Sequence, residues 1–160
     1  MLAYFMPGNR DGVRQKIPRL YETEKVPLEK KMIYQRYAVK ELDFYWLIAE
    51  LDEKENGAFG YANLNDDICA EWGYIPIKEL LENGARLDEE WKLCTYREAM
   101  KKITEERTKV ECFRKRYLEL LRTLGGESGV HILDQLEGVE RELYRLGQAE
   151  WMEKASKRYI

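Results

Sequence analysis

The chain has 160 residues, of which 44% are hydrophobic and 36% are charged, a balance typical of folded proteins and unlike that of disordered ones. No apolar run is long enough to cross a bilayer and no signal-peptide core is present, so we expect a cytoplasmic protein that does not bind membranes. The three cysteines are widely spaced and do not fit a disulfide framework. The one histidine, His131, excludes any site that needs two imidazoles.

The net charge of -3 conceals a segregation of charge along the chain. Residues 1–19 carry a net +3 and contain proline and glycine without any period, which predicts an irregular basic arm. Residues 20–95 carry 17 acidic and 9 basic groups, a net -8, whereas residues 96–124 carry 9 basic and 5 acidic groups, a net +4. We therefore expect these parts to attract different partners.

The acidic segment alternates between strand-like runs and turn residues. Four runs rich in aromatic and β-branched residues predict strands at 32–40, 44–51, 58–64 and 70–75. The dipeptide Asn56-Gly57 is the strongest hairpin signal in the chain and predicts that the second and third strands pair antiparallel.

A short helix and a last extended piece complete this segment. Pro76 predicts the start of the helix, which stops at Asn83-Gly84, and residues 86–93 are expected to be extended. Several antiparallel strands with one short helix indicate an α+β fold and not a parallel sheet with crossover helices.

From Thr95 onward the period changes to that of helices. Thr95 and Glu98 form a capping box, and apolar residues then recur at three- and four-residue steps as far as Leu124, which predicts one long amphipathic helix. A glycine pair ends it, and a second helix with the same stripe is expected over residues 128–146. Because the loop between them is short, the two helices should form an antiparallel hairpin. The apolar stripe can be buried within the hairpin, against the sheet or in a homodimer, and the sequence does not choose among these.

The predicted fold is therefore α+β, with a small antiparallel sheet and a short helix, followed by a C-terminal antiparallel two-helix hairpin. The expected domains are a basic N-terminal arm over residues 1–19, an acidic α+β domain over 20–95 and the helical hairpin over 96–160. The boundary near residue 95 coincides with the reversal of charge.

The long helix carries a run of basic residues that is the best functional lead in the sequence. Clustered lysine and arginine side chains bind phosphates or acidic protein surfaces, so we expect contact with nucleic acid or with a partner here. The candidates are Arg97, Lys101, Lys102, Arg107, Lys109, Arg114, Lys115, Arg116 and Arg122. Glutamates at ion-pair spacing on the same helix leave an alternative, a charged face that contacts only solvent.

A second group of candidates is acidic and lies near the ends of the predicted strands. Carboxylates that converge there would hold Mg²⁺ and support phosphodiester hydrolysis. The candidate metal ligands are Glu50, Asp52, Asp66 and Glu71. Their spacing matches no established metal loop, and a solvated acidic face without a metal is the favoured interpretation.

Aromatic residues concentrate in the predicted sheet, and most should form its core. Exposed tyrosine and tryptophan are common interface anchors, and the candidates for such a surface are Tyr61, Trp72 and Tyr74. Isolated glycines exclude the familiar dinucleotide and phosphate loops, so no cofactor is expected.

The sheet segment also carries an ordered series of motifs: Leu20-Tyr21, Thr23-Glu24, Pro27-Leu28, Lys31, Phe59-Gly60-Tyr61 and Glu71-Trp72-Gly73-Tyr74. In this order and spacing, residues 18–92 resemble a domain family of small bacterial proteins found on plasmids, conjugative elements and phages. The resemblance implies a neighbourhood of genes that counter host restriction and CRISPR defences. It implies no catalytic residue, and the helical hairpin lies outside the family pattern.

Two functions are compatible with these features. The favoured one is a non-enzymatic anti-defence protein, similar to an anti-CRISPR, that inhibits a host nuclease complex by binding the complex, its guide RNA or its DNA. An acidic domain can imitate DNA, while a basic helix can bind nucleic acid or an acidic protein surface. The alternative is a metal-dependent nuclease or phosphodiesterase that uses the acidic residues. The sequence thus leaves open whether the protein is an enzyme and favours a binding protein.

Overall fold

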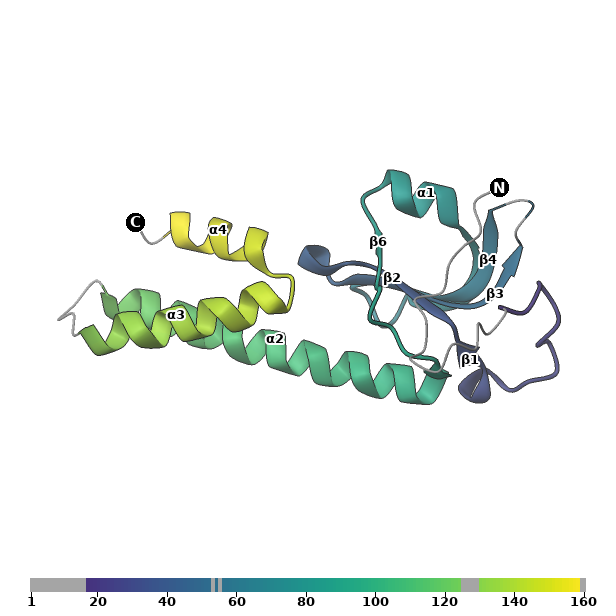
Figure 1. The fold of residues 1–160 in the computed structure, drawn as a ribbon, viewed down its shortest axis with the longest axis horizontal. Helices are drawn as coiled ribbons and strands as arrows, with labels where there is room; N and C mark the ends of the chain where they lie inside the picture. Colours follow the sequence, from purple (N-terminus) through teal and green to yellow (C-terminus); the bar gives the residue numbers. More distant parts are fainter. Residues whose placement is uncertain (1–16, 53, 55, 125–129, 159–160) are drawn as a thin grey trace. The chain divides into compact units, whose positions relative to one another are not determined.

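The computed structural model describes residues 17–52, 54, 56–124 and 130–158. The chain divides into two compact units, residues 1–100 and 101–160, which we call the sheet unit and the helical unit (Figure 1). Except for residues 17–19, the expected basic arm lies outside the described residues, as does the glycine pair at 125–126. Within the described ranges, none of the helices is long and apolar enough to cross a membrane.

The sheet unit is built on an antiparallel five-stranded sheet in the order β5-β4-β3-β2-β6. Its strands are β2 (Gln35–Val39), β3 (Phe44–Asp52), β4 (Gly57–Leu64), β5 (Glu71–Pro76) and β6 (Arg86–Leu87). The prediction of an α+β fold with an antiparallel sheet is confirmed. The turn between β3 and β4 contains Asn56, whose φ of 51° is a left-handed conformation that asparagine tolerates well.

Smaller elements complete the sheet unit. A separate antiparallel pair, β1 (Met32–Ile33) and β7 (Cys94–Thr95), joins the entry into the sheet to the residues before the long helix, and no sequence pattern indicated it. Short 3-10 turns occupy η1 (Leu28–Lys30) and η2 (Lys40–Leu42), and α1 (Ile77–Glu82) is the expected short helix.

One face of the sheet packs against α1 in the main core of this unit. Tyr37 on β2, Ile48 on β3 and Ile75 on β5 lie in one cluster with Ile77 and Leu80 of α1. All five side chains are buried, and removing large apolar side chains from water is the main favourable term in folding.

The opposite face of the sheet is aromatic and is covered by the first turn of a long helix, α2 (Tyr96–Leu124). The ring of Tyr96 lies 5.2 Å from that of Tyr61 on β4. The predicted capping box is confirmed, since the Glu98 N–H donates to Thr95 Oγ1 at 3.2 Å and the Thr95 N–H donates to Glu98 Oε2 at 2.9 Å. The helix therefore begins where the sequence predicts.

An irregularity in β3 decides which way Glu50 points. Ile48 pairs with Gly60, but Glu50 pairs with Phe59, so β3 contains one extra residue, Ala49, at this point. This bulge shifts Glu50 to the aromatic face. Strict alternation from Ile48 would have placed the Glu50 carboxylate in the core against α1.

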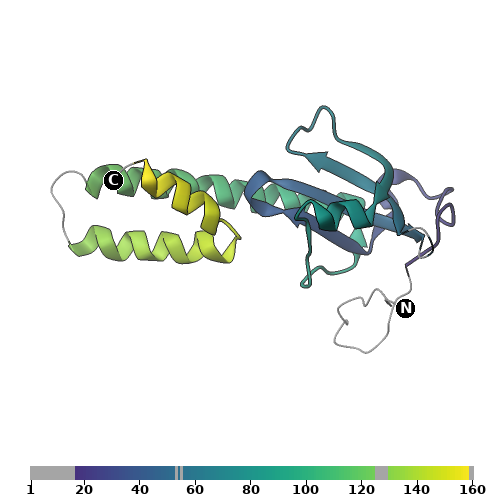
Figure 2. The same cartoon turned by 90° about the horizontal axis from the view of Figure 1, so that it is seen from above.

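Over the residues that the structure describes, the helical unit contains three helices instead of the expected two. α3 (Val130–Arg145) runs back along α2, and α4 (Ala149–Lys157) packs beside both (Figure 2). Tyr117 of α2, Leu143 of α3 and Ala155 of α4 are buried in a common core. The prediction of a two-helix hairpin is therefore incomplete, because the 9 residues of α4 are too few to show a clear helical stripe.

Gly60→Ala is expected to destabilise the sheet unit by about 2 kcal/mol, because the backbone at the bulge must shift to fit the added atom. A Cβ at Gly60 would lie closer than 3.0 Å to the Leu47 carbonyl oxygen. Gly73, the direct partner of Gly60 on β5, is the matched control, since a Cβ there has nothing within 4 Å. Gly73→Ala should be at least as stable as the wild type, because alanine loses less conformational freedom on folding.

Urea unfolding followed by tryptophan fluorescence measures this difference. A Trp151→Phe background leaves every remaining tryptophan in the sheet unit. If both alanine variants lost the same free energy of unfolding, the close approach of the backbone at Gly60 would not be important for stability.

Candidate functional site

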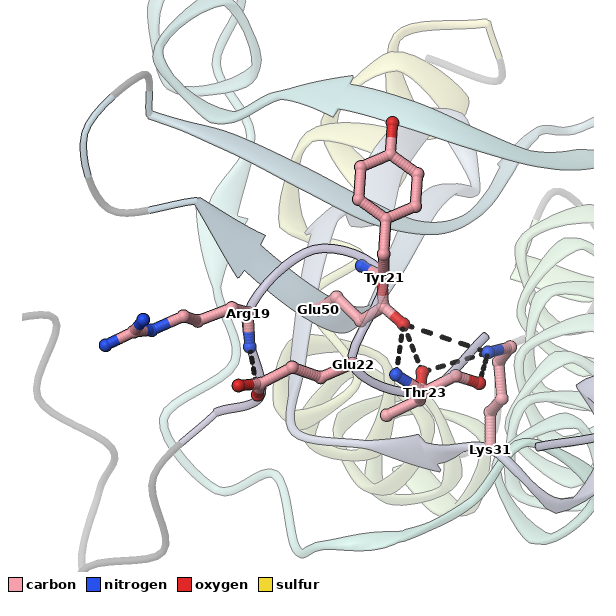
Figure 3. Close-up of polar contacts among 6 residues, drawn as sticks. All are labelled: Arg19, Tyr21, Glu22, Thr23, Lys31 and Glu50. Atoms are coloured by element: carbon pink, nitrogen blue, oxygen red, sulfur yellow. Dashed lines mark hydrogen bonds and ion pairs between the residues drawn. The ribbon is translucent and has the colours of Figure 1, made fainter. Parts of the chain in front are cut away.

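A carboxylate inside the sheet unit is held by the loop that precedes the first strand (Figure 3). Glu50 on β3 accepts hydrogen bonds from the Tyr21 N–H, 2.7 Å from Oε1, from the Thr23 N–H, 3.1 Å from Oε2, and from the Thr23 hydroxyl. Tyr21 has a φ of 71°, and a left-handed residue of this kind lets nearby N–H groups face a single anion. Residues 20–25 thus form a loop around Glu50, which we call the Glu50 cradle.

The loop is also closed by hydrogen bonds of its own. The Leu51 N–H on β3 donates to the Pro18 carbonyl oxygen at 2.9 Å, which attaches the start of the loop next to Glu50. The Arg19 N–H donates to the Glu22 carboxylate at 2.7 Å (Figure 3). The Glu50 cradle is therefore held to β3 through both backbone and side-chain contacts.

Lys31 completes the arrangement as a buried cation. Its ammonium group donates to the Thr23 carbonyl oxygen at 2.5 Å and to Thr23 Oγ1 at 2.9 Å, and lies 3.8 Å from Glu50 Oε2. The Lys31 and Glu50 side chains are each only 4% exposed, and the ammonium group lies 5.7 Å from the centre of the Phe59 ring. A buried charge without a partner is very costly, so each of these two groups compensates the other.

A pocket of about 660 Å³ opens beside this pair. Its lining combines the loop of residues 20–28 with Phe59 of β4 and Tyr74 of β5, while Lys31 and Glu50 supply its buried charges. The volume falls within the range of roughly 300 to 1,000 Å³ that is typical of ligand pockets. The sheet unit therefore has a hollow of a size that can hold a ligand.

Four large apolar side chains at this pocket are exposed to solvent. They are Tyr21 at 78%, Val26 at 37%, Leu28 at 46% and Tyr74 at 56%, and we call them the rim patch. Large apolar side chains that gather at one hollow are typical of a ligand site or a protein interface. Only Tyr74 among them is a predicted site residue.

The other two predicted surface aromatics lie deeper. Tyr61 is buried, and Trp72 is half-buried and stacks on Phe59 with the ring centres 5.6 Å apart. Both also contact the ring of Tyr96, and burial, with a smaller effect of Tyr61, raises the pKa of Tyr96. This cluster packs the sheet against the first turn of α2. Of the three predicted surface aromatics, Tyr74 is therefore the one that is exposed.

The four predicted metal ligands do not converge. Glu50 and Asp52 lie on β3, where they pair with the first residues of β4. Asp66 lies beyond the last residue of β4, in the loop to β5, and Glu71 is the first residue of β5. Asp66 is used within its own turn, where hydrogen bonds from the side chain and the backbone N–H of Cys69 lower the pKa of Asp66. In the part of the chain that the structure describes, no group of three or more His, Cys, Asp or Glu side chains is placed to hold a metal ion.

Two of the nine basic candidates on α2 contact the neighbouring helices. Arg114 donates a hydrogen bond to the side-chain oxygen of Gln148 and lies over the ring of Trp151, 4.9 Å from its centre. Arg116 donates to the side-chain oxygen of Gln135 on α3 at 2.7 Å. Arg114 in particular joins α2 to α4 and to the residue before it, which gives this side chain a structural role.

The remaining seven basic candidates differ in exposure. Arg97 is exposed and pairs with Glu29 at 3.2 Å, and Arg107 is half-buried. The other five remain exposed: Lys101, Lys102, Lys109, Lys115 and Arg122. Together with Arg97 and Arg116, these five side chains are the exposed members of the predicted basic surface.

Sequence patterns did not identify Thr23 and Lys31 as site residues. Neither stands out by composition or period, because their role comes from contacts with Glu50, which lies 27 residues from Thr23 in the sequence. Both occur in the ordered series of sequence motifs in residues 18–92, and that series was the available signal.

Lys31→Met is expected to lower the free energy of unfolding of the sheet unit by about 3 kcal/mol, because Glu50 then keeps a buried charge without its cation. Lys78→Met is the matched control, since Lys78 pairs with Glu82 at a similar 3.9 Å but both side chains are exposed. The control should lose no more than about 0.5 kcal/mol. The urea assay described for the glycine variants measures both, and equal effects would show that burial gives the Lys31–Glu50 pair no special importance.

The sheet unit thus presents a preformed pocket with a fixed polar pair, apolar walls and an exposed apolar rim, which is a combination suited to binding. The carboxylate and ammonium groups of Glu50 and Lys31 are engaged with each other and with Thr23. Comparison of the chain with protein-family models, with curated proteins and with solved structures finds no match.

Proposed function

We propose that this protein is a non-enzymatic binding protein whose sheet unit engages a partner protein through the pocket and the rim patch. The observation that carries the proposal is the exposure of four large apolar side chains around one hollow. Covering such side chains is favourable by roughly 25 cal/mol per Å² of apolar surface removed from water. Tyrosine, which supplies two of the four, is also among the residues that most often anchor protein interfaces.

The anchoring of the loop supports the same proposal. Tyr21 belongs to the Glu50 cradle, where its N–H is bonded to the Glu50 carboxylate before any partner arrives. Tyr74 lies on β5 and is held by the sheet register. A partner that binds these residues does not have to order them first, which keeps the entropic cost of association low.

The partner class that we propose is a host defence nuclease complex, which the protein would inhibit by covering part of its surface. The resemblance of residues 18–92 to proteins of mobile elements supports this setting. The net charge of -8 on residues 20–95 supports it too, because an acidic protein is attracted to the basic surfaces with which nucleases hold nucleic acid. On this proposal the protein acts as an anti-CRISPR-like inhibitor.

A double change in the rim patch, Leu28→Ser with Tyr74→Ser, is expected to reduce capture of a nuclease complex by at least about tenfold, because two apolar anchors are lost. The matched control is Leu133→Ser with Tyr144→Ser, since these side chains on α3 are similarly exposed, at 50% and 72%. The measurement is affinity capture from lysates of bacteria with active restriction and CRISPR nucleases, quantified by mass spectrometry.

The control variant should capture as much as the wild type. Equal loss in both double variants, or undiminished capture by the rim-patch variant, would contradict binding through the pocket. Loss of nuclease inhibition in parallel with loss of capture would support the inhibitory role.

A second candidate function is nucleic-acid binding by α2. It is favoured by one observation, the exposure of the lysines and the arginine at positions 101, 102, 109, 115 and 122 on a helix with a net charge of +4. Phosphate contacts require clustered exposed cations and little further geometry. This surface lies on a different element from the pocket, so the two candidate functions can be tested separately.

Reversal of Lys101, Lys109 and Lys115 to Glu is expected to weaken binding of labelled single-stranded nucleic acid and to flatten its salt dependence. Each lost phosphate contact lowers the slope of log K against log salt by about 0.7, so the three together should lower it by about 2. Reversal of Lys40, Lys54 and Lys92, which are exposed lysines of the sheet unit, is the control with the same change of net charge. An equal effect of both triple variants would assign the binding to overall charge and not to α2.

A further inference from the structure

The residues that line the pocket include equal numbers of positive and negative side chains. Glu24 and Lys25 are exposed members of the lining, and Glu50 and Lys31 are its buried members. The lining therefore holds two cations and two anions, and the buried pair is already neutralised within 3.8 Å. Beside the buried pair, a ligand group with a net charge would leave water without meeting an unpaired opposite charge, whereas an uncharged group avoids that cost.

The buried cation retains one hydrogen-bond donor. A lysine ammonium group has three N–H donors, and two of them are used on the carbonyl and hydroxyl oxygens of Thr23. Glu50 Oε2, at 3.8 Å, is beyond hydrogen-bonding distance. Counting only the described residues, the third N–H of Lys31 has no acceptor, and a ligand oxygen at the pocket would satisfy a donor that is costly to leave unpaired.

The apolar part of the lining is held in a fixed arrangement. The ring of Phe59 is stacked on that of Trp72 at an interplanar angle of 27°. The ring of Tyr74 lies against the backbone of Gly57, so closely that a Cβ at Gly57 would overlap it. Leu28 lines the same pocket as these two rings, and an apolar lining of this kind suits a bulky apolar side chain.

We propose that the pocket binds an uncharged, apolar peptide segment of the partner, with a bulky side chain against Phe59 and a backbone carbonyl oxygen accepting a hydrogen bond from Lys31. This inference rests on the proposed function, because it assumes that the partner is a protein. It adds the chemistry of the segment that the pocket selects. An anionic or a cationic residue at the same place is disfavoured because the buried charges there, Lys31 and Glu50, already neutralise each other.

Three probes that share one side chain test the charge selection. N-acetyl-L-phenylalaninamide is neutral, N-acetyl-L-phenylalanine carries a carboxylate and L-phenylalaninamide carries an ammonium group at pH 6. Each is titrated into the full-length protein, and binding is followed by NMR through the backbone amides of Tyr21 and Thr23. The neutral probe is expected to bind with a dissociation constant on the order of 1 mM, as its small size allows, and the two charged probes at least about fivefold more weakly.

Two variants connect the signal to the pocket. Tyr74→Ser changes an exposed wall residue and leaves the buried Lys31–Glu50 pair intact. It should weaken binding of the neutral probe by at least about fivefold. Tyr144→Ser on α3 is the control and should leave binding unchanged. Lys31→Met should weaken binding of the neutral probe if the variant folds. If it does not fold, the Tyr74 variant alone tests whether the probe binds at the pocket.

Binding of the carboxylate probe as tightly as the neutral probe would overturn the proposal, as would the absence of any shift at Tyr21 and Thr23. If the probes fail while capture of a nuclease complex depends on the rim patch, the proposed function stands and the peptide chemistry is wrong. If the neutral probe binds but capture does not depend on the rim patch, the chemistry of the pocket stands and the proposed function is wrong.

Discussion

Two opposite charges lie almost entirely out of water in the sheet unit, and the chain around them is arranged to satisfy both. Glu50 receives hydrogen bonds from Tyr21 and Thr23, and the Lys31 ammonium group lies 3.8 Å away as its counter-ion. Replacing a buried ion pair with apolar residues of similar volume is often neutral or even stabilising, so its presence is weak evidence for added stability. The Glu50 carboxylate fixes the path of the loop past β3, because it accepts hydrogen bonds from the N–H groups of both Tyr21 and Thr23.

The pocket depends on this path. Were the loop of residues 20–28 free to move away from β3, the hollow between it and Phe59 would lose one wall. The bulge at Ala49 has the same importance, since it places the Glu50 side chain on the aromatic face. The bulge in β3, the buried charge and the loop without regular structure are therefore parts of one arrangement, and this arrangement forms the pocket.

Sequence patterns predict the parts of this molecule that are determined locally. The strands from β2 to β5, the hairpin at Asn56 and the capping box at Thr95 all depend on residues within a few positions of one another. The orientation of the Glu50 side chain cannot be predicted in this way. Alternation along β3 predicts the wrong face of the sheet for this side chain, because the strand contains one extra residue. The presence of acidic residues in a sequence also does not show whether a carboxylate is open to a metal ion or, like that of Glu50, already accepts hydrogen bonds from N–H groups. Arg114 shows the same limit, since a basic residue on a helix has the same appearance in the sequence whether it faces solvent or the ring of Trp151.

The contact between Gly57 and the ring of Tyr74 joins the hairpin turn to the wall of the pocket. A glycine that suits the end of a tight turn also leaves the space that the Tyr74 ring occupies. Any larger residue at position 57 would push the ring aside and change the width of the pocket, even if the turn itself tolerated the change. The size of residue 57 therefore determines whether a large ring at position 74 can form this wall of the pocket.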